Sequence, residues 1–202
     1  MYPDYLPVNP NSASECVVRM SYYYLVATLP MFPPEGPPPM SGSAFLALCR
    51  EHLRAADFAR LERLWADAAD APADESDFVS RWQSRDIQIR NAAARVRAGR
   101  LRRDAAPFLH AHPGMDATLE KSVAEALGKD SPLEREASLD KLRWTLIDEL
   151  AGTDPFAAAA VFAYALKLRI AERWSAMTDE EGQARVRELL AEREKEPQDG
   201  KA

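Results

Sequence analysis

The sequence predicts an all-α protein, a single helical domain of about five to seven helices preceded by an extended, proline-rich segment. After Ser43, apolar residues recur every three or four positions in successive segments that are bounded by capping residues or prolines, as amphipathic helices require. Only residues 22–29 have the composition of a strand, and no second strand candidate is present to pair with them. The 202 residues, of which 47% are hydrophobic, suffice for one sizeable core.

The N-terminal part divides into three segments. Residues 1–19 contain three prolines and little periodicity, so we predict a disordered leader, with Met20 as a plausible natural start. Residues 22–29 are rich in tyrosine and are predicted as a short helix, because a lone strand would have no partner. Residues 30–39 hold six prolines and predict an extended crossing. The helical domain then spans 20–195, and 196–202 form a disordered polar tail.

Capping residues place the first helices after the proline segment. Ser43 is the predicted N-cap of a helix that carries Phe45 and Cys49, and a break near residues 54–57 leads to a second helix ending near Trp65. A polar loop at 68–75 precedes a long helix from about 76 to 103. Its expected buried face comprises Phe78, Trp82, Ile89, Ala92, Ala93 and Val96.

The clearest local prediction is a helix at 132–150. Ser131 is the expected N-cap, Pro132 stands at the first helical position, and Glu134 completes a capping box. Two adjacent apolar stripes give this helix a wide buried face. The stripes are Leu133, Ala137, Trp144 and Ile147, and Leu139, Leu142, Leu146 and Leu150.

Two more helices complete the prediction. Asp154 caps a helix at 156–174, with Pro155 at its first position. This helix is apolar on nearly all sides in its first three turns, so we place it at the centre of the core. Thr178 and Glu181 form a capping box for a last, amphipathic helix at 179–195. Its apolar side chains are Val186, Leu189 and Leu190.

Composition and motifs argue against catalysis and cofactor binding. The net charge is −6, and Cys16 and Cys49 lack the spacing of a disulfide or zinc motif. No glycine-rich phosphate loop or nucleophile elbow is present, and His110 and His112 have no neighbour to complete a metal shell. We therefore expect no enzyme activity, cofactor, metal or small-molecule ligand. No segment is long and apolar enough to span a membrane, so we expect a cytoplasmic protein.

Charge is distributed unevenly. Residues 78–103 hold eight arginines and one acid, whereas 178–199 hold eight acids and four bases. The arginines spread around most of the helix, which suits ion pairs with an acidic partner better than one dense phosphate-binding face. Three interpretations stay open: pairing within the chain, with 178–199 as the acidic partner, a surface for another protein, and binding of nucleic acid.

One acid stands out within an apolar stripe. Asp140 lies on the stripe that runs from Leu133 to Trp144, a position that charged residues rarely occupy. A buried ion pair explains this better than a catalytic acid, and Arg90 or Arg95 is the predicted partner.

Several sequence blocks carry a family resemblance. The stretch 21–30, with three tyrosines and Leu-Pro, followed by the proline tract and 41–50, resembles the start of a bacterial family whose genes lie in V/A-type ATPase operons. The similarity extends over roughly 20–190. Its later blocks are Arg90-Asn91 with 95–98, 132–136 with Leu139, Asp140 and Trp144, and Phe156 with 164–168, Arg173 and Trp174.

That family in turn resembles the C subunit of the V/A-type ATPase, a helical socket between the central shaft and the membrane ring. The resemblance implies a non-catalytic component or accessory factor of such an ATPase, with shaft and ring subunits as partners and a place at the inner face of the membrane. This chain is shorter than a three-lobed C subunit, so it would form part of the socket. A free-standing assembly or regulatory factor, and a nucleic-acid-binding protein using 78–103, are the alternatives. The expected partner-facing residues are Tyr22, Tyr23, Tyr24, Arg90, Asn91, Arg95 and Arg97.

Overall fold

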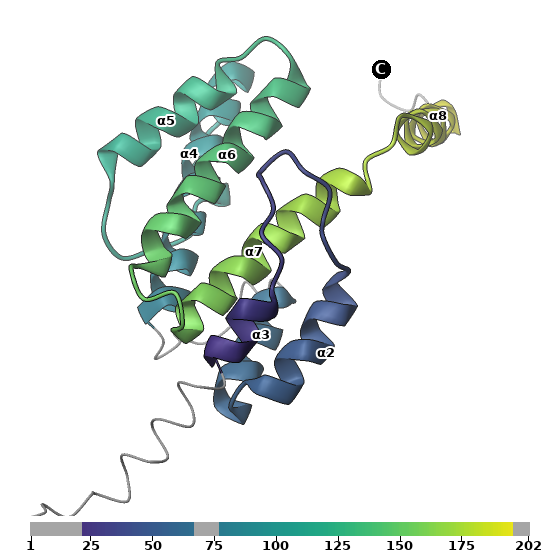
Figure 1. Ribbon diagram of the computed structural model, residues 1–202. Helices are drawn as coiled ribbons and strands as arrows, with labels where there is room; N and C mark the ends of the chain where they lie inside the picture. Colours follow the sequence, from purple (N-terminus) through teal and green to yellow (C-terminus); the bar gives the residue numbers. More distant parts are fainter. Residues whose placement is uncertain (1–21, 67–76, 196–202) are drawn as a thin grey trace, which may run out of the picture.

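The computed structural model describes residues 22–66 and 77–195, and within these ranges the protein is all-α, with no strand (Figure 1). This confirms the predicted fold class. The expected leader at 1–19, the loop at 68–75 and the tail at 196–202 lie outside the described residues. A short helical segment at 22–28 comes first. The α-helices that follow are α2 (Gly42–His52), α3 (Ala55–Trp65), α4 (Asp77–Leu101), α5 (Ala117–Leu127), α6 (Pro132–Ala151), α7 (Ala158–Ser175) and α8 (Asp179–Lys195), with a 3₁₀ turn at Ala106–Phe108.

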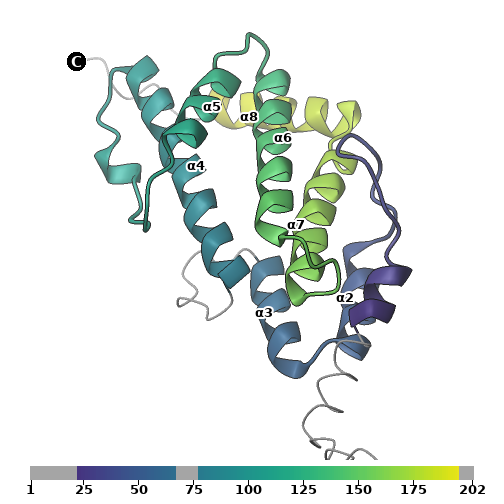
Figure 2. The same ribbon diagram turned by 60° about the vertical axis from the view of Figure 1, so that its left-hand side comes forward.

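Helix α7 forms the centre of the protein, as its sequence predicts. It contacts α2 and α3 on one side and α4 and α6 on the other (Figure 2). Val161, Phe162 and Leu168 are each at most 1% exposed. A helix that is apolar all round can only be stable when neighbours cover most of its circumference, and α7 meets this condition.

Five of the remaining helices, α2 to α6, form two groups around α7. Helices α4, α5 and α6 pack against one another, and α2 packs against α3. Figure 1 shows the α4–α6 group and the α2–α3 pair at different ends of the molecule, joined by α7. The space where α4, α6 and α7 meet holds the candidate site described below.

The N-terminal segment is fastened to the core by aromatic contacts. Residues 22–28 are helical, which confirms the prediction for this stretch, and 30–41 contain no helix. The Phe32 ring contacts the rings of Trp144 and Tyr164 at centroid distances of 5.4 and 5.3 Å. The Tyr164 hydroxyl donates to the Pro30 carbonyl at 3.1 Å. The proline segment is thus held against α6 and α7.

Helix α5 was not predicted, and it adds a helix to the expected number. Asp116 is its N-cap, and its carboxylate accepts hydrogen bonds from the backbone N–H groups of Thr118 and Leu119. Leu119, Val123 and Leu127 are buried against the core. Their spacing of four residues is a helical signal, but an eleven-residue helix with so few large apolar residues gives only a weak pattern.

Several predicted helix starts are displaced. The N-cap of α2 is Ser41, not Ser43, and the Ser41 hydroxyl accepts from the Ala44 N–H at 3.2 Å. Helix α7 begins at Ala158 rather than 156, because the Asp154 carboxylate accepts from the Phe156 N–H and closes a separate turn. Helix α6 begins at Pro132 as predicted, but the Ser131 side chain makes no capping hydrogen bond.

Gly42 explains why α2 can lie so close to α3. A Cβ atom at this position would lie 2.2 Å from the Trp65 ring, so no other residue fits without displacing that ring. The Gly42 N–H donates to the Glu172 carboxylate at 2.6 Å, which ties the start of α2 to α7.

Helix α8 differs from the others because its apolar side chains are not buried. Val186, Leu189 and Leu190 are 56%, 49% and 57% exposed. Figure 1 shows α8 beyond the C-terminal end of α7. The predicted amphipathic helix is thus present as α8, but the described residues of the chain do not cover its apolar face.

Candidate functional site

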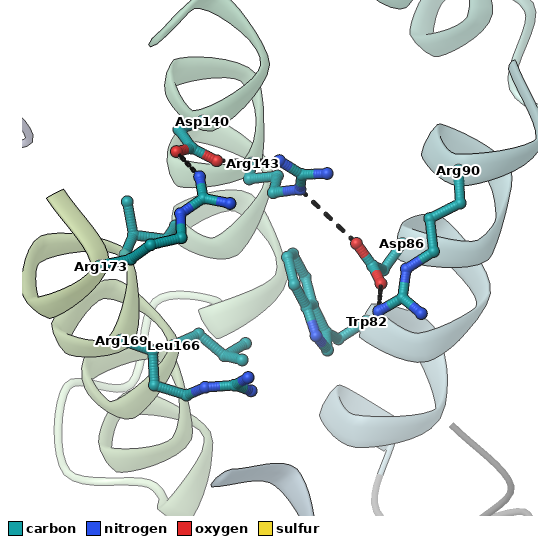
Figure 3. Close-up of a pocket in the computed structure, with 9 residues that line it drawn as sticks. Trp82, Asp86, Arg90, Asp140, Arg143, Leu166, Arg169 and Arg173 are labelled. Carbon is teal, nitrogen blue, oxygen red and sulfur yellow. Dashed lines mark hydrogen bonds and ion pairs between the residues drawn. The ribbon is translucent and has the colours of Figure 1, made fainter. Parts of the chain in front are cut away.

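A charged cleft lies where α4, α6 and α7 meet (Figure 3). Its volume is about 570 Å³. We call it the arginine cleft, because four of its lining residues are arginines. It is lined by Trp82, Asp86, Arg90, Asp140, Arg143, Leu166, Arg169, Ile170 and Arg173.

Each of the three helices contributes two charged side chains one turn apart. Helix α4 supplies Asp86 and Arg90, α6 supplies Asp140 and Arg143, and α7 supplies Arg169 and Arg173. Residues three or four positions apart lie on the same face of a helix. The packing of α4, α6 and α7 turns these three faces toward one cavity.

Asp140 is the centre of the charged network. It is 4% exposed, and it accepts hydrogen bonds from Arg143 at 2.8 Å, from the Trp174 indole N–H at 2.8 Å, and from Arg173. The predicted burial and ion pairing of Asp140 are therefore confirmed. The predicted partners were wrong, because Arg90 pairs with Asp86 and Arg95 pairs with Glu120.

Arg143 connects the two buried carboxylates. Its guanidinium lies 2.8 Å from the Asp140 carboxylate and 3.6 Å from that of Asp86, which is 8% exposed. Asp86 also pairs with Arg90 at 2.6 Å. Arg169 donates to the Leu64 carbonyl at 2.9 Å, at the end of α3. The guanidinium groups are thus fixed in place by the fold.

The wall of the arginine cleft is rich in charged side chains, with four arginines and two aspartates among its lining residues. Trp82, Leu166 and Ile170 supply an apolar part of the wall. Such an arrangement can attract and orient negatively charged oxygen atoms, but it offers neither a nucleophile nor a metal-binding set of side chains.

A second, apolar hollow lies on the other side of the Asp140 network, between α6, α7 and the proline segment. Its volume is about 460 Å³. It shares Asp140 and Ile170 with the arginine cleft, so these residues separate the two spaces. Its remaining lining residues are Pro33, Pro34, Glu35, Gly36, Leu133, Ala137, Lys141, Trp144 and Trp174.

Tyr22 serves the fold rather than a partner surface. It is 4% exposed, and its hydroxyl donates to the buried Asp57 carboxylate, which also pairs with Arg54 at 3.2 Å and Arg60 at 3.0 Å. Burial, followed by the hydrogen bond to Asp57, raises the pKa of the Tyr22 hydroxyl. The prediction that Tyr22 faces a partner is therefore wrong.

Asn91 is the second predicted interface residue that proves to be buried. It is 2% exposed, and its side-chain amide donates to the His110 carbonyl at 2.7 Å and accepts from the His110 N–H at 2.9 Å. Gln88, 1% exposed, makes the same paired contact with the Asp116 backbone, at 2.8 and 3.3 Å. The Asn91 and Gln88 side-chain amides thus hold the segment between α4 and α5. This role explains why these two residues on the basic helix are polar, uncharged and buried.

The other predicted interface residues lie at the surface. Tyr23 and Tyr24 are 55% and 58% exposed; the Tyr23 ring contacts Phe156 at 4.6 Å, and the Tyr24 ring contacts His52 at 5.2 Å. The Arg95 and Arg97 side chains are 44% and 60% exposed. Arg90 is the one member of the predicted set that also lines the arginine cleft.

The acids that meet the basic helix come from its neighbours α5 and α6. Arg85 pairs with Asp116 at 3.4 Å, Arg95 with Glu120 at 2.8 Å and Arg97 with Glu136 at 3.5 Å. The expectation that 178–199 supplies the acids is wrong for these three pairs. Pairing within the chain also reduces the positive charge that α4 can offer to phosphates.

Two kinds of site are absent from the parts of the chain that the structure describes. No three or more His, Cys, Asp and Glu side chains are grouped so that they could hold a metal ion. Among the same residues, no helix has the length and apolarity needed to cross a membrane.

The arginine cleft was missed in the sequence, although part of its signal was visible. Arg169 and Arg173 are spaced by one turn on the most apolar helix, which indicates that one side of that helix faces a polar environment. Arg169 and Arg173 line the same cleft as Asp86 and Arg143 only because of the way in which α4, α6 and α7 pack. The periodicity of apolar residues along one helix does not predict how that helix crosses its neighbours.

A family model described as "Protein of unknown function (DUF2764)" matches residues 44–197. The chain belongs to this family. The match contains α4, α6, α7 and every residue of the arginine cleft, and it begins after the tyrosine-rich block at 22–30. Neither the curated proteins nor the solved structures contain a match to this DUF2764 protein.

Proposed function

We propose that this DUF2764 protein is a non-catalytic component or accessory factor of a V/A-type ATPase, a connector similar to the C subunit that docks between the central shaft and the membrane ring at the inner face of the membrane. The sequence blocks at 22–30 and 164–174 suggest the ATPase. The observation that carries a docking role is the apolar face of α8, which the described residues of the chain leave exposed. No nucleotide, metal or catalytic chemistry is required for this role.

The face of α8 has the geometry of a docking helix. Val186, Leu189 and Leu190 occupy positions i, i+3 and i+4, so they lie along one side of the helix. Each is about half exposed. Completing the burial of three such side chains contributes roughly 1 kcal/mol each or more, which favours association with an apolar groove of a partner.

The two blocks that carry the ATPase resemblance meet in the fold. Tyr164 contacts the proline segment through its hydrogen bond to the Pro30 carbonyl and through the Phe32 ring. Tyr23 and Tyr24 remain exposed on the helix at 22–28, which precedes the proline segment. They therefore provide a second surface, besides α8, through which a neighbouring protein can be held.

Binding of nucleic acid by 78–103 is the weaker alternative. Arg85, Arg95 and Arg97 are engaged by acids of the same chain. Affinity for a nucleic-acid backbone grows with the number of phosphates that cations neutralise, and each internal pair lowers that number.

The proposal is tested by capture of the tagged protein from its own native membranes, followed by mass spectrometry. We expect shaft and ring subunits of the ATPase to be retained. The double variant Leu189→Glu with Leu190→Glu should lose them, because it places two charges on the apolar face of α8. Ala184→Glu places one carboxylate on the opposite face of that helix and should retain them.

Two results would count against this function. The first is the absence of every shaft and ring subunit under conditions in which the ATPase itself stays assembled. The second is equal retention by the double variant and by Ala184→Glu, which would remove α8 as the docking element.

A further inference from the structure

We infer that the free protein forms a reciprocal dimer, in which the apolar face of α8 of each copy fills the apolar hollow of the other copy. The apolar face of α8 consists of Val186, Leu189 and Leu190, and the apolar hollow is the space between α6, α7 and the proline segment. The inference rests on the same face that carries the proposed docking role. It goes beyond that role, because it names what covers this face when no ATPase is present.

The apolar hollow has the chemistry of a receptor for an apolar helix face. Most of its lining is apolar or aromatic, with Pro33 and Pro34 on the proline segment, Leu133 and Ala137 on α6, and Trp174 on α7. Leu133 is 64% exposed, so this wall is open to an incoming chain. Exposed apolar surfaces with a polar rim are typical of sites where proteins associate.

The size of the hollow matches the face of α8. Removal of one buried leucine side chain can leave a cavity of roughly 150 Å³. A hollow of about 460 Å³ therefore has room for about three aliphatic side chains. Helix α8 presents three, Val186, Leu189 and Leu190, on one side of the helix, and each is about half exposed. The face and the hollow thus agree in number as well as in chemistry.

The α8 of the same chain does not meet the hollow in register. Within α7, Ile170 is the lining residue furthest from α8, and three residues separate the two helices. If α8 folded back about Met177, Val186 would lie opposite Leu168, because each is nine residues from Met177. The two leucines of the face would lie further along still. The face would pass the hollow, so another copy is the better source of these side chains.

The position of α8 suits an exchange between two copies. Figure 1 shows α8 beyond the C-terminal end of α7, to which it is joined by a short connection. Short connections of this kind favour the exchange of an element between identical chains. When both copies exchange α8, a two-fold axis relates the two contacts and the assembly closes at two chains. Insertion in one direction only would instead continue into a row of molecules.

The reciprocal dimer has a consequence for docking. It removes the apolar face of α8 from water while the protein is free. Because the same face cannot contact the hollow and an ATPase subunit at once, the dimer dissociates before α8 docks. The two equilibria are therefore linked, and a partner that binds α8 shifts the protein toward the monomer.

The test uses the full-length protein, purified without ATPase subunits. Sedimentation velocity from low to high micromolar concentration would measure the mass of the particle, and hydrogen exchange would measure the protection of the α8 amides over the same range. We expect the mass to rise from 22.5 kDa to twice that value, with no larger species. We also expect the α8 amides to exchange more slowly as the dimer forms.

Four single substitutions locate the contact. Leu189→Glu charges the apolar face of α8, and Ala137→Glu charges the hollow. Each acts twice in a reciprocal dimer, so each should weaken dimerisation at least about tenfold. Ala184→Glu on the opposite face of α8 and Thr145→Glu on α6 outside the hollow introduce the same charge and should dimerise as the wild type does. All four positions are exposed, so helical content by circular dichroism should not change.

Three results would overturn the inference. The first is a monomer at every concentration, whether or not its α8 amides are protected. The second is loss of the dimer in Leu189→Glu but not in Ala137→Glu, which would show that two α8 helices pair with each other. The third is growth beyond two chains, which would contradict reciprocal exchange.

These results are separate from the test of the proposed function. A protein that is always monomeric, but whose tagged form retains ATPase subunits from native membranes, would remove only the dimer. A protein that dimerises as described, but whose tagged form retains no ATPase subunit, would remove only the proposed function.

Discussion

Replacement of Asp140 by alanine is the substitution with the most predictable consequence for stability. The Asp140 carboxylate is 4% exposed and joins α6 to α7 through Arg173 and the Trp174 N–H, and it holds Arg143 of its own helix. In Asp140→Ala, the indole N–H and two guanidinium groups lose an acceptor while the surrounding helices stay packed. The cost depends on how well each of these donors can find a substitute.

The structure allows the cost to be worked out for each donor. Arg143 is 19% exposed and keeps only the 3.6 Å contact with Asp86, so the loss of its charged hydrogen bond contributes about 1.5–2 kcal/mol. The unsatisfied Trp174 N–H contributes about 1 kcal/mol. The Arg173 side chain is 45% exposed and water can replace its partner, so its contribution is under about 1 kcal/mol. We therefore expect Asp140→Ala to lower the free energy of unfolding by about 3 kcal/mol.

The assay is equilibrium unfolding in urea, with Asp148→Ala as the matched control. Asp148 lies on the same helix and pairs with Lys167, but its side chain is 57% exposed, so its removal should cost less than about 1 kcal/mol. A loss below about 1 kcal/mol for Asp140→Ala, equal to that of the control, would refute the reasoning. It would mean that water already satisfies the donors around Asp140.

Three further predictions concern other parts of the chain. Burial raises the pKa of the Cys49 thiol to about 12 from an ordinary value of 9.0. The contribution of the neutral, buried thiol to the free energy of unfolding is therefore complete below pH 9 and is lost as the pH rises toward 12. The free energy of unfolding should then fall by up to about 1.4 kcal/mol per pH unit more steeply in the wild type than in Cys49→Ala, measured by urea unfolding between pH 8 and 11. Asn91→Ala leaves the His110 N–H and carbonyl without their side-chain partner and should cost about 2 kcal/mol in the same assay; a loss under about 0.5 kcal/mol would show that water replaces the amide. Duplex DNA or RNA should show no salt-sensitive binding at physiological ionic strength; micromolar binding that weakens steeply with salt would restore the nucleic-acid alternative.

The sequence predicts the fold well wherever a helix buries a long apolar face. The positions of α6 and α8 follow from Pro132 and Thr178, and the central place of α7 follows from its apolar circumference. Helix α5 escaped prediction because it is short and its apolar face rests on three large residues. The start of α7 was misplaced because Asp154 accepts from Phe156 in a turn of its own, a choice that the local sequence leaves open.

The candidate site was predicted only in part. The position of Asp140 within an apolar stripe was enough to predict its burial and pairing, since a charge among buried residues needs a partner. The identity of that partner was not predictable, because Arg173 lies 33 residues further along the chain and meets Asp140 only through the packing of α6 on α7. The buried roles of Tyr22 and Asn91 likewise depend on contacts with distant residues, Asp57 and His110.

The central claim, that this DUF2764 protein belongs to a V/A-type ATPase complex, is tested most directly from the side of the ATPase. The intact complex would be isolated from the cells that produce the protein, through a tag on one of the shaft proteins, and analysed by native mass spectrometry. We predict a 22.5 kDa component that corresponds to this chain and dissociates when Leu189→Glu and Leu190→Glu are introduced. An intact complex that contains shaft and ring subunits but lacks this chain would contradict the claim.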